Sequence, residues 1–258
     1  MSNPTLLCYK ISMFSLHTQM MTKAISALIL LSLPLLGHAE TRISYGLHHG
    51  SGYFEHDSDT EVNALTFSVS HKFNALNEIK LSSGYNKIKH TENKQEDEGV
   101  ADTSLTYRYR KIFSGHHLVD MKSKIKFPTA DKDKNLGTGE HDVSLGFSNY
   151  NRIHNIWLLS ELFHKWRGDN KQRNMDNGYS AKLGISAITK SKISTGGFFS
   201  YHEASSNRSV AREEITLYLN YKKSKRMKGT LYIIHGLSDA SAEWAGGFQL
   251  SHSLAFEK

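Results

Sequence analysis

The sequence predicts an all-β fold: a single antiparallel transmembrane β-barrel of about twelve strands, with both termini on the periplasmic side. Three observations predict it. After residue 39, short segments alternate apolar and polar side chains. The spacers between these segments are long and hydrophilic, then short, in turn, as external loops and periplasmic turns are in outer-membrane barrels. Only Pro128 follows residue 40, at a strand end, which suits a closed sheet because proline cannot donate to a β-ladder.

The first 39 residues are interpreted as a targeting region. Residues 1–19 fit no part of a secretion signal, so we take them as an upstream mis-start or an extended charged start. Residues 20–39 contain Lys23, the apolar run Ala24–Leu36 and a small-x-small cleavage site before Glu40. These are the three parts of a signal peptide, and the run is shorter than the roughly 20 residues of a membrane-spanning helix. We therefore expect cleavage of this segment.

The remaining part, residues 40–258, is expected to form the barrel in the outer membrane of a Gram-negative bacterium. The lone Cys8 precedes it, so it offers no disulfide and no thiolate metal site. Without Lys10 and Lys23, 30 of the 32 basic residues remain against 25 acidic ones. This mild excess fits anion binding, contact with lipopolysaccharide phosphates, or an ordinary solvated surface.

The spacers set the expected order of the elements. Long external loops are expected over residues 56–61, 89–102, 128–141, 167–178, 203–212 and 238–244. Short turns are expected at Asn74–Glu78, Ser114–His117, Asn151–Asn155, Thr189–Lys192 and Lys222–Met227. Six loops and five turns separate twelve strands.

Alternation within the strands predicts two faces. The apolar face includes Leu65, Phe67, Val69, Leu105, Tyr107, Met121, Ile125, Val143, Leu145, Ile215, Leu217, Phe248 and Leu250. The alternate positions carry mostly Lys, Arg, Asp, Ser and Thr. A sheet in lipid must close and must turn its apolar face outward, and the charged face could not fill a dry core. Aromatic residues near strand ends are expected at the lipid interfaces: Phe73, Phe113, Tyr150, Trp157, Tyr221 and Phe256.

Two strand segments, residues 156–166 and 230–237, are apolar on both faces. Either their inner residues pack against a plug or an inserted loop, or the lumen has an apolar patch there. The second interpretation would favour hydrophobic solutes.

Two segments carry a family resemblance. The segment KFPTADKDKNLGTGEHDVSLGF, residues 126–147, resembles a glycine-rich pattern of the outer-membrane barrel family named after the meta-pathway of phenol degradation. The closing segment, residues 236–256, is similar to that family's last loop and strand. The resemblance implies a channel for small, often aromatic or hydrophobic compounds. The chain departs from the pattern at Ala130, where glycine is usual, and at Glu257-Lys258, which follow the closing Phe256.

Charged residues of the polar face are the predicted site. Pore-lining side chains are expected at Arg108, Arg110, Asp120, Lys122, Lys124, Lys126, Asp142 and Glu161. In a narrow barrel this basic wall would bias the pore toward anions. Alternatively, the three acids pair with the five cations in a ladder that holds the barrel in shape.

Histidines are abundant but offer no metal site. In a strand, neighbours such as His48 and His49, or His116 and His117, point to opposite faces and cannot readily hold one ion. His235 is expected toward the lumen and His252 toward lipid. No cofactor, metal or nucleic acid is expected.

An enzymatic alternative rests on His49 and Ser51, which share one strand face with Tyr45 and Leu47. A lipid-facing imidazole can activate a hydroxyl for acyl transfer, as in outer-membrane phospholipases and lipid A deacylases. No Asn or acid can be placed beside the pair from sequence. We therefore predict no enzyme but a channel for small solutes, with this lipid hydrolase and a structural barrel with a plugged lumen as alternatives. The expected partners are outer-membrane lipids, lipopolysaccharide, the barrel assembly machinery and a small solute.

Overall fold

The computed structural model describes residues 40–52, 59–92, 95–134, 136–168, 175–188, 192–206 and 209–255. The expected targeting segments 1–19 and 20–39 lie outside the described residues, as do Phe256 and Glu257-Lys258. Within the described part, no helix is long and apolar enough to cross a bilayer.

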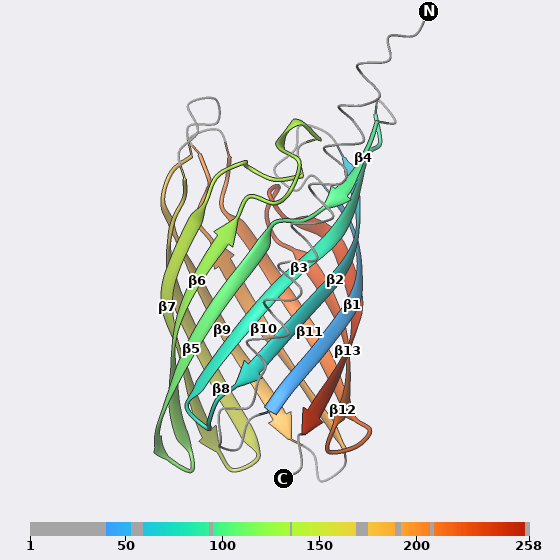
Figure 1. The fold of residues 1–258 in the computed structure, drawn as a ribbon. Helices are drawn as coiled ribbons and strands as arrows, with labels where there is room; N and C mark the ends of the chain where they lie inside the picture. The colour runs from blue at the N-terminus through green and yellow to red at the C-terminus, as the bar shows by residue number, and fades with distance from the viewer. Residues whose placement is uncertain are drawn as a thin grey trace, which may run out of the picture. The chain divides into compact units, whose positions relative to one another are not determined.

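The described residues form a closed antiparallel barrel of twelve strands, plus one short strand at its rim (Figure 1). The strands are β1 (Glu40–Gly52), β2 (Thr60–Lys72), β3 (Asn77–His90), β4 (Glu96–Val100), β5 (Thr103–Ser114), β6 (His117–Phe127), β7 (Asp142–Ile153), β8 (Ile156–Trp166), β9 (Gly178–Ile188), β10 (Ile193–His202), β11 (Arg212–Lys222), β12 (Met227–Gly236) and β13 (Ala242–Ala255). One 3-10 turn, η1 (Lys132–Lys134), lies between β6 and β7. The predicted fold class and strand number are confirmed.

The ring closes because β1 pairs along its whole length with both β2 and β13. Glu40, at the start of β1, fastens this seam: it forms ion pairs with Lys72 at 2.8 Å and Arg42 at 2.9 Å, and it accepts a hydrogen bond from Ser253 at 2.6 Å. One carboxylate thus ties together the first, second and last strands of the ring. Closure removes the sheet edges, so each of the twelve barrel strands has a neighbour on both sides, whereas the rim strand β4 pairs with β3 alone among the described residues.

The segment expected as a loop over residues 89–102 is partly strand, which corrects the prediction. The upper half of β3 pairs with β4 through Tyr85–Lys89, and its lower half pairs with β5 through Asn77–Ser82. β4 therefore extends the position of β5 above a break at Ala101-Asp102 (Figure 1). The last loop is also shorter than predicted, since β13 begins at Ala242.

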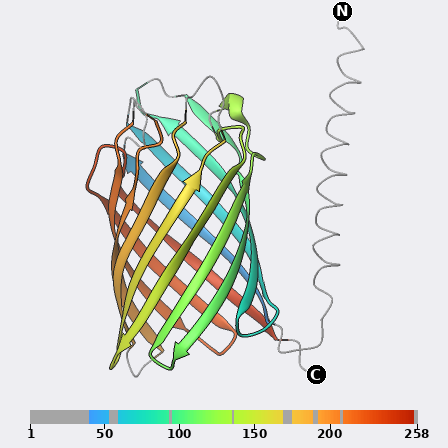
Figure 2. The same ribbon diagram turned by 90° about the vertical axis from the view of Figure 1, so that its left-hand side faces the viewer.

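Short turns close one end of the barrel, and local hydrogen bonds and backbone conformation explain two of them. The tight turn after β2 is held by Asn74, whose side-chain oxygen accepts hydrogen bonds from the backbone N–H groups of Leu76 and Asn77, at 2.8 and 2.9 Å. The turn between β7 and β8 has only two residues, and His154 takes a positive φ of 56° there. The longer connections lie at the opposite end, where η1 is found (Figure 2).

The two faces of the wall are as the alternation predicts. Large apolar residues are exposed on the outer surface, including Leu47, Leu65, Leu145, Leu183, Leu217 and Leu231. The buried positions are mostly small and polar, including Ser44, Ser68, Ser104, Ser148, Ser200 and Thr216. An outer apolar belt around a polar interior is the inverse of a soluble barrel and is the pattern of a transmembrane one.

Three expectations about side-chain direction are wrong. Tyr150 lines an inner pocket and does not lie on the lipid face. Trp157 shares its register position with Arg152, whose guanidinium lies 5.9 Å from the indole ring, so it also belongs to the inner face. His235 pairs with the exposed Trp244 and stacks on it at 4.3 Å, so it faces outward and not toward the lumen. All three residues follow the unbroken alternation of their strands: Tyr150 has the parity of Ser148, Trp157 that of Glu161, and His235 that of Leu231. The expectations failed because they set this parity aside.

Candidate functional site

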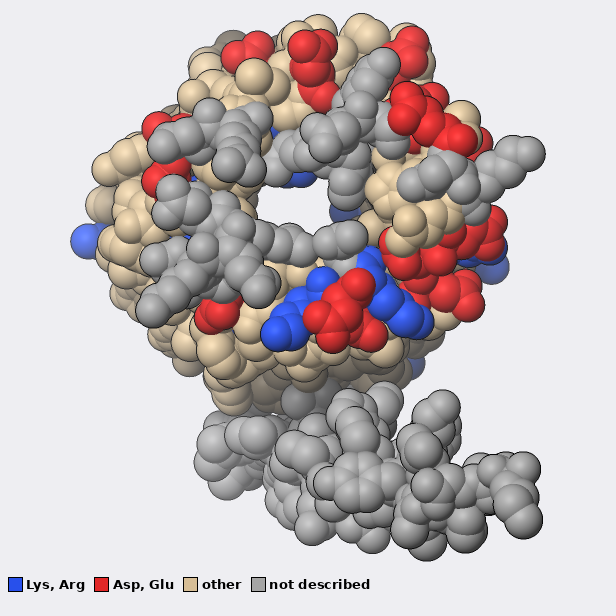
Figure 3. All heavy atoms as spheres, turned by 90° about the horizontal axis from the view of Figure 1, so that it is seen from above, with Lys and Arg blue, Asp and Glu red and all other residues tan. Residues whose placement is uncertain are grey.

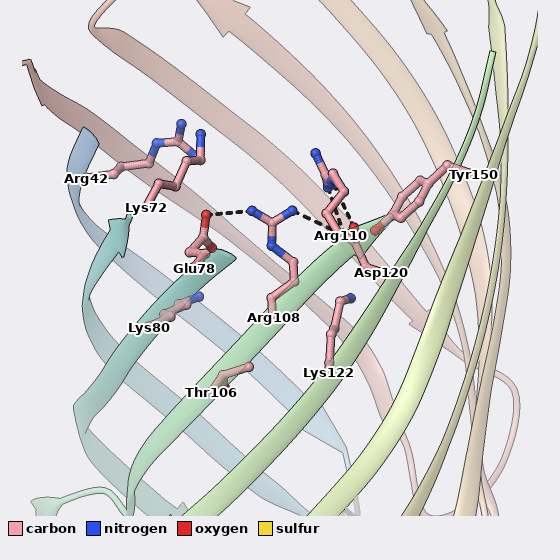
Figure 4. A pocket seen from close by; sticks show the side chains of 10 residues that line it. All are labelled: Arg42, Lys72, Glu78, Lys80, Thr106, Arg108, Arg110, Asp120, Lys122 and Tyr150. Atoms are coloured by element: carbon pink, nitrogen blue, oxygen red, sulfur yellow. Dashed lines mark hydrogen bonds and ion pairs between the residues drawn. The ribbon is translucent and has the colours of Figure 1, made fainter. Parts of the chain in front are cut away.

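The eight predicted pore-lining residues lie on the inner wall formed by β5, β6, β7 and β8. Four of them, Arg108, Arg110, Asp120 and Lys122, line one inner pocket of about 440 Å³. Six further residues complete its lining: Arg42, Lys72, Glu78, Lys80, Thr106 and Tyr150. They come from β1, β2, β3, β5 and β7, so the pocket exists only because the ring is closed (Figure 4).

Asp120 is the centre of the pocket's charge network. Its carboxylate accepts hydrogen bonds from Arg110 at 2.6 and 2.8 Å, and Arg108 lies at 3.4 Å. Arg108 also contacts Glu78 at 2.9 Å, so it bridges two acids (Figure 4). The Asp120 side chain is only 1% exposed, whereas that of Arg110 is 31% exposed. The carboxylate is thus part of the wall, and the guanidinium reaches the lumen.

A second network continues along the same wall. Lys122 pairs with Glu161 at 2.8 Å, and Ser148 donates to the same carboxylate at 2.5 Å. Asp142 pairs with Lys165 at 3.0 Å and with Lys126 at 3.2 Å. Arg108, Arg110, Lys122 and Lys126 are therefore paired, as the structural interpretation of the predicted site requires.

Other inward cations have no such partner. Among the described residues, no carboxylate lies within ion-pair distance of Lys80, Lys124 or Lys182. Lys80 and Lys124 flank Thr106 in one cross-strand row, and Lys124 is exposed. Lys80 and Lys182 are half-buried, so part of each side chain is open to the lumen.

Sequence reasoning missed several members of this wall. Glu78, Lys80, Lys165 and Lys182 follow the same alternation as their neighbours and could have been found by parity. Asp102 pairs with Lys126 at 3.1 Å, but it lies in the break between β4 and β5, where no periodicity applies. Arg42 and Lys72 join the pocket only through closure of the ring, which no local signal reveals.

An aromatic patch adjoins this charged wall and runs from β8 to β12. Four inward rings lie against a glycine on the neighbouring strand: Phe163 on Gly146, Phe198 on Gly184, Tyr218 on Gly196 and Tyr232 on Gly247. A Cβ added to Gly146 would lie 2.5 Å from Cγ of Phe163, and one on Gly184 would lie 2.7 Å from Cβ of Phe198. Each glycine thus gives its ring room to lie along the wall. The rings line the lumen without filling it.

These rings explain the two segments that are apolar on both faces. Phe163 and Trp157 are inner residues of β8, and Tyr232 and Ile234 are inner residues of β12. Two lysines reach toward the aromatic patch: Lys182 lies 4.3 Å from the Phe198 ring, and Lys122 lies 5.6 Å from that of Phe163. The patch therefore meets the charged wall, with cations placed over ring faces.

The connection between β6 and β7 folds over part of the upper end. Ala130 and Leu136 pack on Ile88 and Val62, inner residues of β3 and β2. Asp102 accepts a hydrogen bond from the backbone N–H of Ala130 at 3.1 Å, and Lys126 donates to Thr138 at 2.7 Å. This segment is part of the family-like stretch 126–147, and its glycines permit the close packing: a Cβ on Gly137 would lie 2.8 Å from that of Ala130. An opening remains along the axis in the view from above (Figure 3).

The histidine pair at residues 48 and 49 divides between the two faces, as expected of strand neighbours. His48 faces inward, and its Nδ1 lies 3.1 Å from the Tyr232 hydroxyl. His49 faces outward with Leu47, and its Nδ1 lies 2.9 Å from Oδ1 of Asn63 on β2. Ser51 lies on the same outer face, two residues along β1. In the described part of the chain, no three His, Cys, Asp or Glu residues are grouped as a metal site would need.

Comparison with known proteins identifies the fold. No family model matches the chain, and no curated protein matches it. Among solved structures, the chain is similar to the COG4313 outer membrane channel from Pseudomonas putida F1, with a TM-score of 0.67 and 12% identity over 85% of this chain and 97% of that one. It is also similar to the KdgM porin, with a TM-score of 0.53 and 12% identity over 84% and 99% of the two chains. The translocator domain of autotransporter NalP from Neisseria meningitidis gives 0.52 and 10%, over 95% and 98%. The fold is that of outer-membrane β-barrels.

Proposed function

We propose that this protein is an outer-membrane channel that passes small solutes and prefers anions. The observation that carries the proposal is the inner wall, where Lys80, Lys124 and Lys182 face the lumen without a carboxylate partner among the described residues. Rings of fixed charge set the ion preference of a pore. The axial opening supports a channel over a plugged structural barrel (Figure 3), and two of the similar structures are a channel and a porin by name.

The solute class that fits the lumen best is an aromatic or hydrophobic carboxylate. The charged part of the inner wall offers Arg and Lys side chains, and the adjoining aromatic patch offers Phe163, Phe198, Tyr218 and Tyr232. An anion with an apolar ring satisfies both walls at once, since the carboxylate meets the cations and the ring stacks along the patch. The likeness of residues 126–147 to the phenol meta-pathway family supports the same class.

The cellular setting follows from this proposal. The signal peptide at residues 20–39 would direct the chain across the inner membrane, and the assembly machinery would insert it with both termini on the periplasmic side. Outer-membrane lipids and lipopolysaccharide would then surround the apolar belt. The first and last strands pair with Glu40 opposite Ala255, so the start of β1 and the end of β13 lie at the same end of the barrel.

Conductance in a planar lipid bilayer tests the channel and its selectivity together. We expect discrete conductance steps and, in a salt gradient, a reversal potential that indicates anion preference. The double variant Lys80→Glu with Lys124→Glu should shift this potential toward cation preference, because it turns two unpaired lumen cations into anions.

The matched control is Lys223→Glu with Lys225→Glu, which makes the same change of net charge at exposed positions of the β11–β12 turn. It should leave the reversal potential nearly unchanged. A complete lack of conductance in the wild-type protein would refute the channel. Equal shifts in both double variants would refute selection by the inner wall.

A further inference from the structure

His49 and Asn63 form a cross-strand pair on the outer surface of the barrel, toward the end with the longer connections. They are direct register partners on β1 and β2, both are exposed, and Nδ1 of His49 lies 2.9 Å from Oδ1 of Asn63. An amide oxygen can only accept a hydrogen bond, so Nδ1 is the donor in this pair. The pair thus fixes the orientation of the ring and leaves Nε2 as the nitrogen through which a base would act.

Ser51 lies beside this imidazole on the same face. Two strand residues span about 6.7 Å, a distance that the His49 ring and the Ser51 hydroxyl can bridge by side-chain rotation. The pairing of β1 with β13 shifts register beside Ser51: Ser51 lies opposite Trp244 and Gly52 opposite Ala242, so the extra residue is Glu243, on β13. Gly52 takes a φ of 143°. On β1 itself, Ser51 keeps the alternation with His49, and its pairing with Glu61 of β2 is regular.

The surface next to His49 is hollow. Its partner on β13 is Gly246, which has no side chain to cover the ring. A depression of about 530 Å³ opens there, lined by His49, Asn63 and the apolar side chains of Leu47, Leu65, Leu231 and Phe248. Lys87, the register partner of Asn63 on β3, also lines it and forms an ion pair with Glu96 at 2.8 Å. An apolar floor with a polar rim matches a lipid that has acyl chains and a polar headgroup.

We propose that Ser51, His49 and Asn63 form a serine hydrolase site for acyl esters of membrane lipids, on the outer surface of the barrel and separate from the lumen. Ser51 is the nucleophile, His49 is the general base, and Asn63 is the positioning residue that holds the imidazole.

The reaction needs only the ester and water. His49 Nε2 takes the proton of the Ser51 hydroxyl as Oγ bonds to the ester carbonyl carbon, which gives a tetrahedral intermediate. The ester C–O bond then breaks, and the leaving alcohol oxygen takes the proton from Nε2. A water molecule, deprotonated by His49, attacks the acyl-serine, and Ser51 recovers its proton as the fatty acid leaves. The net change is ester plus water to carboxylic acid plus alcohol.

The test is fatty-acid release from two kinds of vesicle by the full-length protein: phosphatidylethanolamine with phosphatidylglycerol, and the same lipids with lipopolysaccharide. The two arms distinguish a phospholipid ester from a lipid A ester. We expect release by the wild type, none by Ser51→Ala, and a loss of about 10²–10⁴-fold in His49→Phe. A long-chain sulfonyl fluoride should label Ser51, as mapped by mass spectrometry of the peptides.

Asn63 is tested by a split between kinetic constants. Asn63→Leu, which removes the acceptor for Nδ1–H, should lower kcat and leave KM nearly unchanged. Asn63→Asp, which keeps an acceptor oxygen, should restore part of the rate. If Asn63 were only a surface residue, neither variant would change kcat.

Ser160→Ala is the matched control, because Ser160 also faces outward, on β8, opposite the exposed Leu183. It should hydrolyse like the wild type. The proposal is overturned if the wild type releases no fatty acid and takes no label at Ser51, or if Ser51→Ala still hydrolyses. Conductance of Ser51→Ala should equal that of the wild type, so failure here and failure of the channel are separate results.

Discussion

Asp120 shows how single residues maintain the inner wall. It is almost fully buried, yet it is ionised between two arginines from the adjacent strand β5, and one of these reaches a second acid on β3. A buried carboxylate is tolerated when charged donors surround it. The same residue therefore stabilises the wall and cancels charge that would otherwise face the lumen.

Asp120→Asn should destabilise the folded barrel by about 1–3 kcal/mol, because it leaves Arg110 with a neutral partner. The loss is limited because the Arg110 guanidinium is partly exposed and water screens its charge. Denaturant unfolding of the detergent-solubilised protein, followed by heat-modifiable migration, measures the change. Asp133→Asn, at an exposed position of η1, is the control and should have little effect. Equal shifts for the two variants would contradict a structural role of the Asp120 network.

At the scale of elements, neighbouring strands place an inward aromatic residue opposite a glycine, and this pairing leaves the lumen wide. On β10, alternation sends Phe198 inward, onto Gly184 of β9, and Phe199 outward, where it is 37% exposed. Aromatic–glycine pairs stabilise a sheet because the ring covers the bare backbone. They also keep large side chains close to the wall.

Phe198→Ala should widen the lumen locally and raise single-channel conductance, because a ring on the inner wall becomes a methyl group. Phe199→Ala changes the same kind of side chain one residue away, on the lipid face, and should leave conductance as in the wild type. Planar-bilayer recording measures both. An increase in the Phe199 variant alone would mean that the two faces of β10 are exchanged.

At the scale of the whole molecule, the barrel is inverted relative to a soluble one, with Leu145, Leu217 and other large apolar side chains exposed around its outside. Such a belt is stable only in lipid. Closure of twelve strands satisfies the backbone that lipid cannot hydrate. The whole ring, not any single strand, is the stable unit.

Leu145→Arg should impair folding into lipid vesicles by about 2–4 kcal/mol, the cost of a cation on the lipid-facing surface of the barrel. Thr106→Arg places the same side chain in the inner pocket, in contact with water, and should fold nearly as well as the wild type. Denaturant titration of the protein in vesicles provides the comparison. If Thr106→Arg were the more damaging variant, the assignment of inner and outer faces would fail.

Local periodicity explains why so much was predictable from the chain itself. Strand number, the inward direction of Arg108, Arg110 and Lys122, and the shared outer face of His49 and Ser51 all follow from alternation of period two, which needs no partner strand. Prediction failed where periodicity is interrupted or was set aside: Asp102 lies in a break between strands, whereas Tyr150 and Trp157 follow the alternation inward although their aromatic rings near strand ends suggested the lipid face.

The sequence by itself determined the closed antiparallel barrel, its two chemically distinct faces and the cationic character of one stretch of the inner wall. Only the tertiary structure decided which side chains meet. Asn63 lies beside His49, Arg42 and Lys72 join the pocket of Asp120, and each inward ring finds its glycine because of the register between strands. That register is a property of the whole closed ladder, in which every strand is set by both of its neighbours. For this reason residue alternation predicts the direction of a side chain, and only closure of the ring selects its partner.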